Sequence, residues 1–437
     1  MEETGHAGRS RLGLGLRLGA LAVALVLAAL LVVNYLRPIP PVTSTQVLPR
    51  AIAQGTEPNI PWPTDGQAAI GADNIGLLAS AAGARSLPIA SVAKVMTALV
   101  VLDTKPLAKG EQGPAIAITQ ADVAEYQRAA ANQESTVKVE LGESLSEYQA
   151  LQGLLIPSGN NLASLLARWS LGSTDAFVVQ MNEKAKQLGM TQSRFMDVSG
   201  ISPNTVSVPS DLVRMGLTAM QNPVLADIVG QQEVTLPGAA HAPNVNAELG
   251  KQGIVGIKTG NIPQVGAVYL AAATAQLAGG RNVMLFAAVQ GPPTLANAFA
   301  DAESLLAVVR TALQVKRVVG SGQVVGRYQS AWGDSTDITA TSDVDMVVWP
   351  GAPVRSELRA PSVVVPLNAG SKASVHLQAG NQQFDLPLET TDRINSPSPF
   401  EELAVRGVAR STKKRTDESA CTTEARVQSF TRLASQI

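Results

Sequence analysis

One uninterrupted apolar segment near the N-terminus limits what this chain can fold into. Residues 18–36 (LGALAVALVLAALLVVNYL) contain no charged side chain, and these 19 residues approach the ~20 that span a bilayer as a helix. Arg9, Arg11 and Arg17 precede the segment, and such positive charge marks the cytoplasmic side. The sequence therefore predicts a single-pass cell-membrane protein with a cytoplasmic tail at residues 1–17 and an extracytoplasmic remainder.

A cleaved signal peptide is the alternative interpretation of this segment. The apolar part of a signal peptide usually has about 7–15 residues and ends at a small-x-small cleavage site. This segment is longer and ends in Asn34-Tyr35-Leu36, followed by Arg37 and Pro38. These features favour a retained anchor.

Charge, cysteine and histidine content exclude several kinds of site. The 437 residues include 34 Lys and Arg against 35 Asp and Glu, and this balance argues against nucleic acid as a partner. A single cysteine, Cys421, cannot form an intrachain disulfide or a thiolate metal site. The three histidines, His6, His241 and His376, lie far apart in the sequence. We therefore expect neither a histidine metal site nor a serine–histidine pair.

Changes in sequence texture divide the rest of the chain. Residues 37–64 are rich in proline and predict an extended stalk. Residues 65–315 mix helical and strand patterns and predict an α+β domain, an antiparallel sheet between helical layers. In residues 316–395, short strand-like runs alternate with Gly, Pro, Asn and Asp, which is typical of a small C-terminal all-β domain. Residues 396–437 are polar and predict a flexible or weakly helical tail.

Helical and strand periodicities place the elements of the α+β domain. We expect helices at residues 90–102, 144–156, 161–171, 174–188 and 294–313, and strands at residues 254–258, 267–274 and 282–290. Three possible chemical motifs fall at the start of a helix, in a loop between helices, and on a strand.

The first motif is Ser91-Val92-Ala93-Lys94. Residues three apart share one face of a helix, so the hydroxyl of Ser91 and the amine of Lys94 can exchange a proton. Lys94 is followed by a mostly apolar stretch, where desolvation would lower its pKa towards that of a usable base. Considered alone, the tetrapeptide is a loose pattern and favours a helix-capping serine with a solvated lysine one turn later.

The other two motifs are also ambiguous in isolation. Ser158-Gly159-Asn160 follows Pro157 in a break between helices and could simply cap the next helix. Lys258-Thr259-Gly260 ends a strand-like run, where a cation, a hydroxyl and a close backbone approach could meet an anionic ligand. An ordinary edge-strand lysine is the alternative there.

The three motifs, in this order and in these secondary-structure contexts, form a far more specific pattern than any one of them alone. With them the sequence resembles the serine-type D-alanyl-D-alanine carboxypeptidases, the low-molecular-mass penicillin-binding proteins. The resemblance covers residues 67–313 and includes PIASVAKVMTALVVLD, LLIPSGNNLA, SVPSDLVRMG and GIKTG. It implies a β-lactamase/transpeptidase-like α+β fold, and residues 318–391 are similar in position and texture to the extra C-terminal domain of that family.

The resemblance also implies residue roles and partners. Ser91 would be the acylated nucleophile, Lys94 its general base and Ser158 a proton relay to the departing D-alanine. Substrate-binding roles are implied for Asn160, which contacts the peptide amide, Lys258, which keeps the site positive, Thr259, which binds the terminal carboxylate, and for Gly260 and Asn261 of the same strand. Backbone N–H groups of Ser91 and Asn261 would form the oxyanion hole. Peptidoglycan stem peptides would be substrates and β-lactams covalent inhibitors, without a metal or other cofactor.

Departures from the family pattern concern two asparagines. Asn161 stands where an acidic residue is common, and Asn261 stands where an aromatic residue or histidine is common. We expect tuning rather than loss of activity, because Asn261 would act through its backbone. Arg281 is the nearest basic residue after the Lys-Thr-Gly strand that could help hold the substrate carboxylate, and it is kept outside the set of site residues.

Other functions use the same three motifs. An endopeptidase or transpeptidase would act on the same stem peptide, whereas a class A β-lactamase would hydrolyse its acyl-enzyme with an additional glutamate. A membrane-tethered wall-binding or β-lactam-sensing protein would keep the fold without turnover. The anchor and the C-terminal β domain favour an enzyme working on a fixed wall polymer, so the carboxypeptidase is the preferred interpretation.

Overall fold

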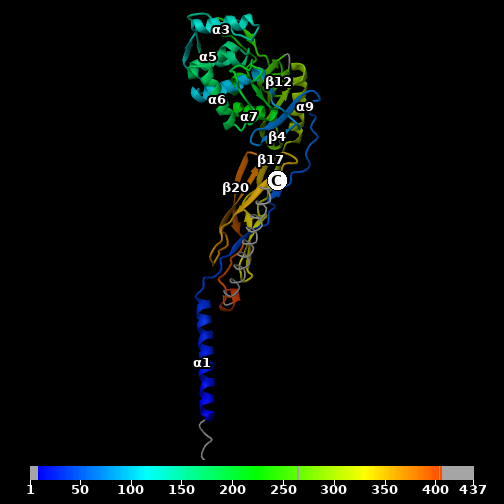
Figure 1. Cartoon of the computed structure of the whole chain (residues 1–437). Coiled ribbons are helices and arrows are strands. Elements are labelled where there is room, and N and C mark those ends of the chain that lie inside the picture. Colours follow the sequence, from blue (N-terminus) through cyan, green and yellow to red (C-terminus); the bar gives the residue numbers. More distant parts are fainter. Residues whose placement is uncertain (1–7, 240, 263–264, 403, 406–437) are drawn as a thin grey trace, which may run out of the picture.

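The computed structural model describes residues 8–239, 241–262, 265–402 and 404–405. Figure 1 shows an elongated molecule with a long helix at one end, a β-rich domain in the middle and an α+β domain at the other end. The helix is α1 (Gly8–Tyr35), and its segment Arg17–Tyr35 is long and apolar enough to cross a membrane. Cys421 and most of the predicted polar tail lie outside the described residues.

The middle domain is built around a seven-stranded antiparallel sheet with the order β1-β15-β16-β20-β19-β18-β2, and β14 pairs with β17 beside it. Its strands are β1 (Thr43–Gln46), β2 (Ala51–Ile52), β14 (Gln314–Val319), β15 (Val324–Gln329), β16 (Ser335–Ala340), β17 (Val344–Val348), β18 (Val354–Arg359), β19 (Lys372–Ala379) and β20 (Gln382–Thr390).

The predicted stalk at residues 37–64 is wrong as a separate extended segment. Two of its short runs form β1 and β2, which are the two end strands of the seven-stranded sheet. Gln46 of β1 also donates to the hydroxyl of Ser356 on β18 at 2.8 Å, so the sheet curls towards closure. Val42 and Leu48 are buried in the core of this domain. The N-terminal segment therefore completes the β domain.

Removal of the two N-terminal strands is expected to destabilise the β domain. Losing the burial of Val42 and Leu48 alone costs about 1.5–3 kcal/mol each, and both sheet edges lose a neighbour. We expect a chain that starts at Ala53 to show a β-domain transition at lower temperature, and faster proteolysis, than a chain that starts at Ile39. Calorimetry of the two α1-free chains measures this, and coincident transitions would contradict the role of the strands.

The α+β domain contains a five-stranded antiparallel sheet with the order β11-β12-β13-β3-β4. Its strands are β3 (Gln67–Ala72), β4 (Gly76–Ser80), β11 (Ile254–Ile262), β12 (Gly266–Gln276) and β13 (Asn282–Gln290). Minor strands are β5 (Leu87–Pro88), β6 (Ala115–Ala117), β7 (Ser144–Ser146), β8 (Val206–Ser207), β9 (Glu233–Val234) and β10 (Ala242–Pro243).

Helices cover both faces of this sheet (Figure 1). They are η1 (Ala90–Val92), α2 (Ala93–Thr104), α3 (Gln120–Ala131), α4 (Glu147–Leu155), α5 (Asn160–Leu171), α6 (Thr174–Gln187), α7 (Pro209–Gln221), α8 (Pro223–Val229), η2 (Ala278–Gly280) and α9 (Leu295–Ala312). Side chains alternate along a strand, so Leu270 of β12 faces the core with α2 and α7, and Tyr269 faces the core with α9. The predicted sheet between helical layers is confirmed.

The two domains contact each other directly. The turn between β3 and β4 meets the β19–β20 hairpin, where the backbone N–H of Asn381 donates to the carbonyl of Ile75 at 3.0 Å. Trp349, just after β17, is buried in the core beneath α9. The β domain therefore supports the α+β domain on the side towards α1 (Figure 1).

Candidate functional site

Ser91 and Lys94 lie together at the start of α2, on the helix face that the sequence predicts. Ser91 belongs to the short helix η1 and makes no side-chain cap, so the capping interpretation of this serine fails. Lys94 is completely buried, and its Nζ lies 2.8 Å from the Oγ of Ser91. A solvated lysine is therefore excluded, and the amine can exchange a proton with the hydroxyl.

The second motif reaches the same amine from the turn before α5. Lys94 Nζ lies 3.2 Å from Ser158 Oγ and 2.6 Å from Asn160 Oδ1. Ser158 adopts a positive φ of 67°, a region that costs a non-glycine residue about 1–3 kcal/mol. Neither side chain caps α5, whose N-cap is Gly159. The structure thus brings Ser91, Lys94, Ser158 and Asn160 into one hydrogen-bonded cluster.

The third motif lies on β11, next to the backbone of Ser91. A Cβ at Gly260 would lie 2.8 Å from the Cβ of Ala90 and 3.1 Å from the nitrogen of Ser91, so only glycine lets the strand come this close. Lys258 and Thr259 are buried, and Lys258 Nζ donates to the carbonyl of Thr259 at 3.3 Å.

Burial and charge adjust the two lysines differently. Burial lowers the pKa of Lys94 well below its ordinary value, and the positive charge of Lys258 lowers it further, against the carboxylates of Asp197 and Glu134. Burial lowers the pKa of Lys258 to about 7. Burial and the charge of Lys258 thus both favour the neutral amine form of Lys94, which is the form able to accept a proton.

A pocket of about 340 Å³ opens in front of this cluster. Ser91, Asn160 and Asn261 line it, whereas Lys94, Ser158, Lys258 and Thr259 are not among its lining residues and are nearly or fully buried. Ser91 therefore presents its hydroxyl to a ligand in this pocket, and the buried amines of Lys94 and Lys258 lie behind the pocket wall.

The loop after α6 forms a wall of this pocket that the sequence analysis did not assign. Asp197 Oδ2 accepts from the backbone N–H groups of Ser199, Gly200 and Ile201 at 2.8–3.0 Å. Gly200 has a φ of +82°, and a Cβ there would overlap the carbonyl oxygen of Ala90. The loop thus holds the residue that precedes Ser91.

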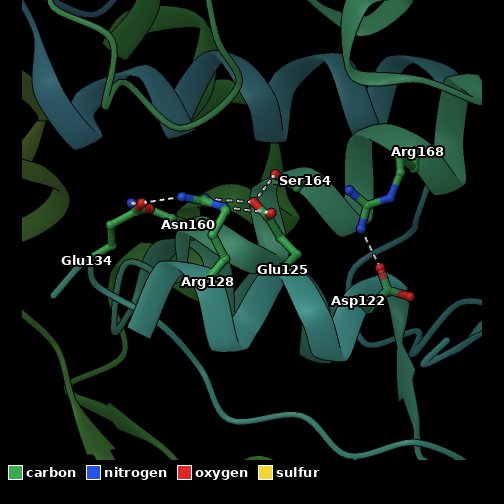
Figure 2. Close-up of polar contacts among 7 residues, drawn as sticks. All are labelled: Asp122, Glu125, Arg128, Glu134, Asn160, Ser164 and Arg168. Atoms are coloured by element: carbon green, nitrogen blue, oxygen red, sulfur yellow. Dashed lines mark hydrogen bonds and ion pairs between the residues drawn. The ribbon is translucent and has the colours of Figure 1, made fainter. Parts of the chain in front are cut away.

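Glu134 is a second pocket residue that the sequence analysis missed. Its Oε2 accepts from Asn160 Nδ2 at 2.8 Å, and its Oε1 pairs with Arg128 Nη1 at 2.9 Å (Figure 2). Arg128 belongs to α3, a helix that the sequence analysis did not predict. No spacing rule connects Glu134 to the motif at residues 158–160, so no sequence pattern indicates this contact.

Two further residues from the sequence analysis, Asn161 and Arg281, do not belong to the hydrogen-bonded cluster around Lys94. Asn161 pairs with the backbone of Val137, accepting from its nitrogen at 3.0 Å and donating to its oxygen at 2.8 Å, so it anchors the loop before α4. Arg281 lies in the turn between β12 and β13, whereas Thr259 pairs with Tyr269 towards the other end of β12. Arg281 therefore does not lie at the site.

Solved structures identify the fold. The chain aligns with penicillin binding protein 5 from Haemophilus influenzae at a TM-score of 0.57 and 20% identity, over 78% of this chain and 100% of that one. It aligns with the Streptomyces K15 DD-transpeptidase at a TM-score of 0.50 and 24% identity, over 58% of this chain and 98% of that one. The fold is that of the penicillin-binding proteins, with an α+β domain and a β domain, and the predicted fold class is confirmed.

Sequence relatives identify the family. Residues 68–288, half of the chain, match the family described as D-alanyl-D-alanine carboxypeptidase. The D-alanyl-D-alanine carboxypeptidase of Streptomyces sp. (strain K15) is 30% identical over 211 residues, which cover 44% of this chain and 69% of that protein. The chain therefore belongs to the D-alanyl-D-alanine carboxypeptidase family, as its motifs suggest.

Relatives with different names fall within the same family. The D-alanyl-D-alanine endopeptidase of Escherichia coli is 33% identical over 146 residues, covering 33% of this chain and 44% of that protein. The D-alanyl-D-alanine carboxypeptidase DacB2 of Mycobacterium tuberculosis is 34% identical over 205 residues, covering 45% and 65%. The chain thus spans less than two thirds of the length of these two relatives.

Proposed function

We propose that this protein is a membrane-anchored serine D-Ala-D-Ala carboxypeptidase that removes the terminal D-alanine from peptidoglycan stem pentapeptides. The observation that carries the proposal is the buried Lys94 amine, within hydrogen-bond distance of Ser91, Ser158 and Asn160. A neutral amine there can activate a serine hydroxyl without histidine.

The proposed reaction proceeds through an acyl-enzyme. Lys94 takes the proton of Ser91 while Oγ attacks the carbonyl carbon of the penultimate D-alanine, and backbone N–H groups of Ser91 and Asn261 stabilise the oxyanion. The C–N bond then breaks, and Ser158 passes a proton to the departing D-alanine. Water hydrolyses the ester, with Lys94 again as base, and restores Ser91.

Substrate binding is assigned to the β11 edge and to Asn160. Thr259 would bind the terminal carboxylate, Lys258 would keep the site positive, Gly260 allows the close backbone approach, and Asn160 would contact the peptide amide. Helix α1 would hold this domain outside the cell membrane as a retained anchor, at a height set by the β domain.

The test of this proposal compares two substrates. We expect the full chain in detergent to release D-alanine from a monomeric pentapeptide, and a β-lactam to add its mass to the tryptic peptide that contains Ser91. Labelling without D-alanine release would indicate a sensor, and rapid turnover of the β-lactam would indicate a β-lactamase. Absence of both labelling and release would overturn the proposal.

Endopeptidase activity is the second candidate, because the E. coli relative is named as an endopeptidase. Cleavage of a cross-linked dimer faster than the pentapeptide would favour it. Both activities would use the same acyl-enzyme, so the comparison of the pentapeptide with the cross-linked dimer tests only which leaving group the site accepts.

A further inference from the structure

Glu134 lies at the edge of the pocket and touches none of the residues that would form or break a bond. Its side chain is only 6% exposed, and its two oxygens have separate partners. Oε1 faces Arg128 of α3, and Oε2 faces the amide nitrogen of Asn160 (Figure 2). Arg128 is held in turn by both oxygens of Glu125, each at 3.0 Å. The carboxylate of Glu134 is therefore fixed from outside the site.

A carboxylate fixed in this way determines which face of the Asn160 amide meets Lys94. A carboxylate can only accept hydrogen bonds, so Asn160 must turn its NH2 group towards Glu134. Its carbonyl Oδ1 then faces Lys94 Nζ, 2.6 Å away. A neutral amine has two N–H groups and one lone pair. With the N–H groups donated to Asn160 and Ser158, the lone pair remains for the hydroxyl of Ser91.

The opposite amide orientation would disable the base. The NH2 group of Asn160 would then donate to the lone pair of Lys94, and the amine would no longer accept the proton of Ser91. We propose that Glu134 is a positioning residue that prevents this by fixing the Asn160 amide, so that the lone pair of Lys94 stays directed at Ser91. This inference rests on the proposed function, because it assigns Lys94 as the base.

Glu134 also acts on Lys94 through its negative charge. The charged groups that act on Lys94 are Glu134 from the loop after α3, Asp197 from the loop after α6 and Lys258 from β11, while its direct partners are uncharged. Glu134 and Asp197 raise the pKa of Lys94, and burial and Lys258 lower it. Loss of the Glu134 charge therefore lowers the pKa of Lys94. Because acylation needs the deprotonated amine, the rise of the acylation rate with pH should shift to lower pH.

The decisive variants are Glu134→Gln and Glu134→Ala. Arg128 can only donate, so a glutamine at position 134 turns its carbonyl to Arg128 and its NH2 group to Asn160, which reverses the Asn160 amide. We expect Glu134→Gln to slow acylation by a labelled β-lactam by about 10²-fold or more, since a positioned base contributes 10²–10⁴-fold. Glu134→Ala loses the hydrogen bonds to Asn160 and Arg128 but does not impose the reversed amide, so it should slow acylation by only about tenfold. A merely structural role would give the reverse order, because glutamine is the better isostere.

A rescue and a control complete the set. In Arg128→Met/Glu134→Gln the glutamine is free to turn its carbonyl to Asn160, so acylation should recover to within about tenfold of wild type. Glu140→Gln is the matched control, because it also removes one negative charge but from an exposed carboxylate that pairs with Lys138. We expect it to label at the wild-type rate.

A titration of Lys94 tests the inference independently of activity. Selective ¹³C labelling of lysine and comparison with Lys94→Met identifies its NMR signal, and the pKa of Lys94 should fall in the order wild type, Glu134→Ala, Glu134→Gln. A wild-type protein that is not acylated would overturn the proposed function, while the titration would still report on Glu134. Equal pKa values in the two variants, or milder kinetics for Glu134→Gln than for Glu134→Ala, would overturn the positioning role.

Discussion

Replacing Ser91 by alanine is expected to abolish covalent β-lactam labelling, and replacing Lys94 by methionine is expected to slow it by about 10³-fold or more. The first change removes the oxygen that would carry the adduct. The second removes the proposed base, whose Nζ lies 2.8 Å from that oxygen. Mass spectrometry of the Ser91 peptide measures the first effect, and stopped-flow labelling measures the second.

The fold should survive the change at Lys94. The side chain is fully buried, and an apolar side chain of similar length avoids the cost of placing an amine in the core. We therefore expect no fall in the melting temperature of Lys94→Met. Lys251→Met serves as a control because that lysine is exposed and its amine pairs with Glu248, a carboxylate outside the candidate site. Labelling of Lys94→Met at the rate of this control would rule out Lys94 as the base.

Replacing Gly200 by alanine is expected to slow acylation by about 10²-fold, the loss that a displacement of about 1 Å at a reacting group can cause. A Cβ at Gly200 would overlap the carbonyl of Ala90, so the backbone next to Ser91 must shift. The same stopped-flow assay measures the effect.

Gly172→Ala is the matched control for this prediction. Gly172 has a φ of +81°, nearly that of Gly200, but a Cβ there would meet nothing within 4 Å. Both variants therefore bear the same left-handed strain, about 1–3 kcal/mol, and only one bears the clash. Equal acylation rates in the two would show that the loop does not position Ser91.

Local geometry explains which parts of the site could be predicted. The contact between Ser91 and Lys94 follows from helical spacing, and it needs no knowledge of the rest of the chain. Glu134 meets Asn160 only because α3 packs beside α5, and that helix was missed in an alanine-rich, polar segment. The residue that fixes the amide was therefore outside the reach of sequence patterns.

Long-range pairing explains the error at residues 37–64 and the distance of Arg281 from the site. β1 and β2 are short and proline-flanked, and their partners are distant: Gln46 and Ser356 are 310 residues apart in the chain. Nothing in residues 37–64 alone indicates such a pairing. Arg281 was considered for the site because it follows the Lys-Thr-Gly strand in sequence, but the length of β12 carries it to the far end of the sheet.

The order of strands in the chain has a consequence for biosynthesis. β1 and β2 leave the ribosome before the α+β domain, and β14 to β20 leave after it. The seven-stranded sheet that β1 and β2 share with β15, β16 and β18 to β20 can be completed only when the last of these strands has been made, whereas every strand of the five-stranded sheet has been made by then. All residues of the candidate site are therefore made before the β domain can be completed, although that domain lies between the site and the N-terminal helix.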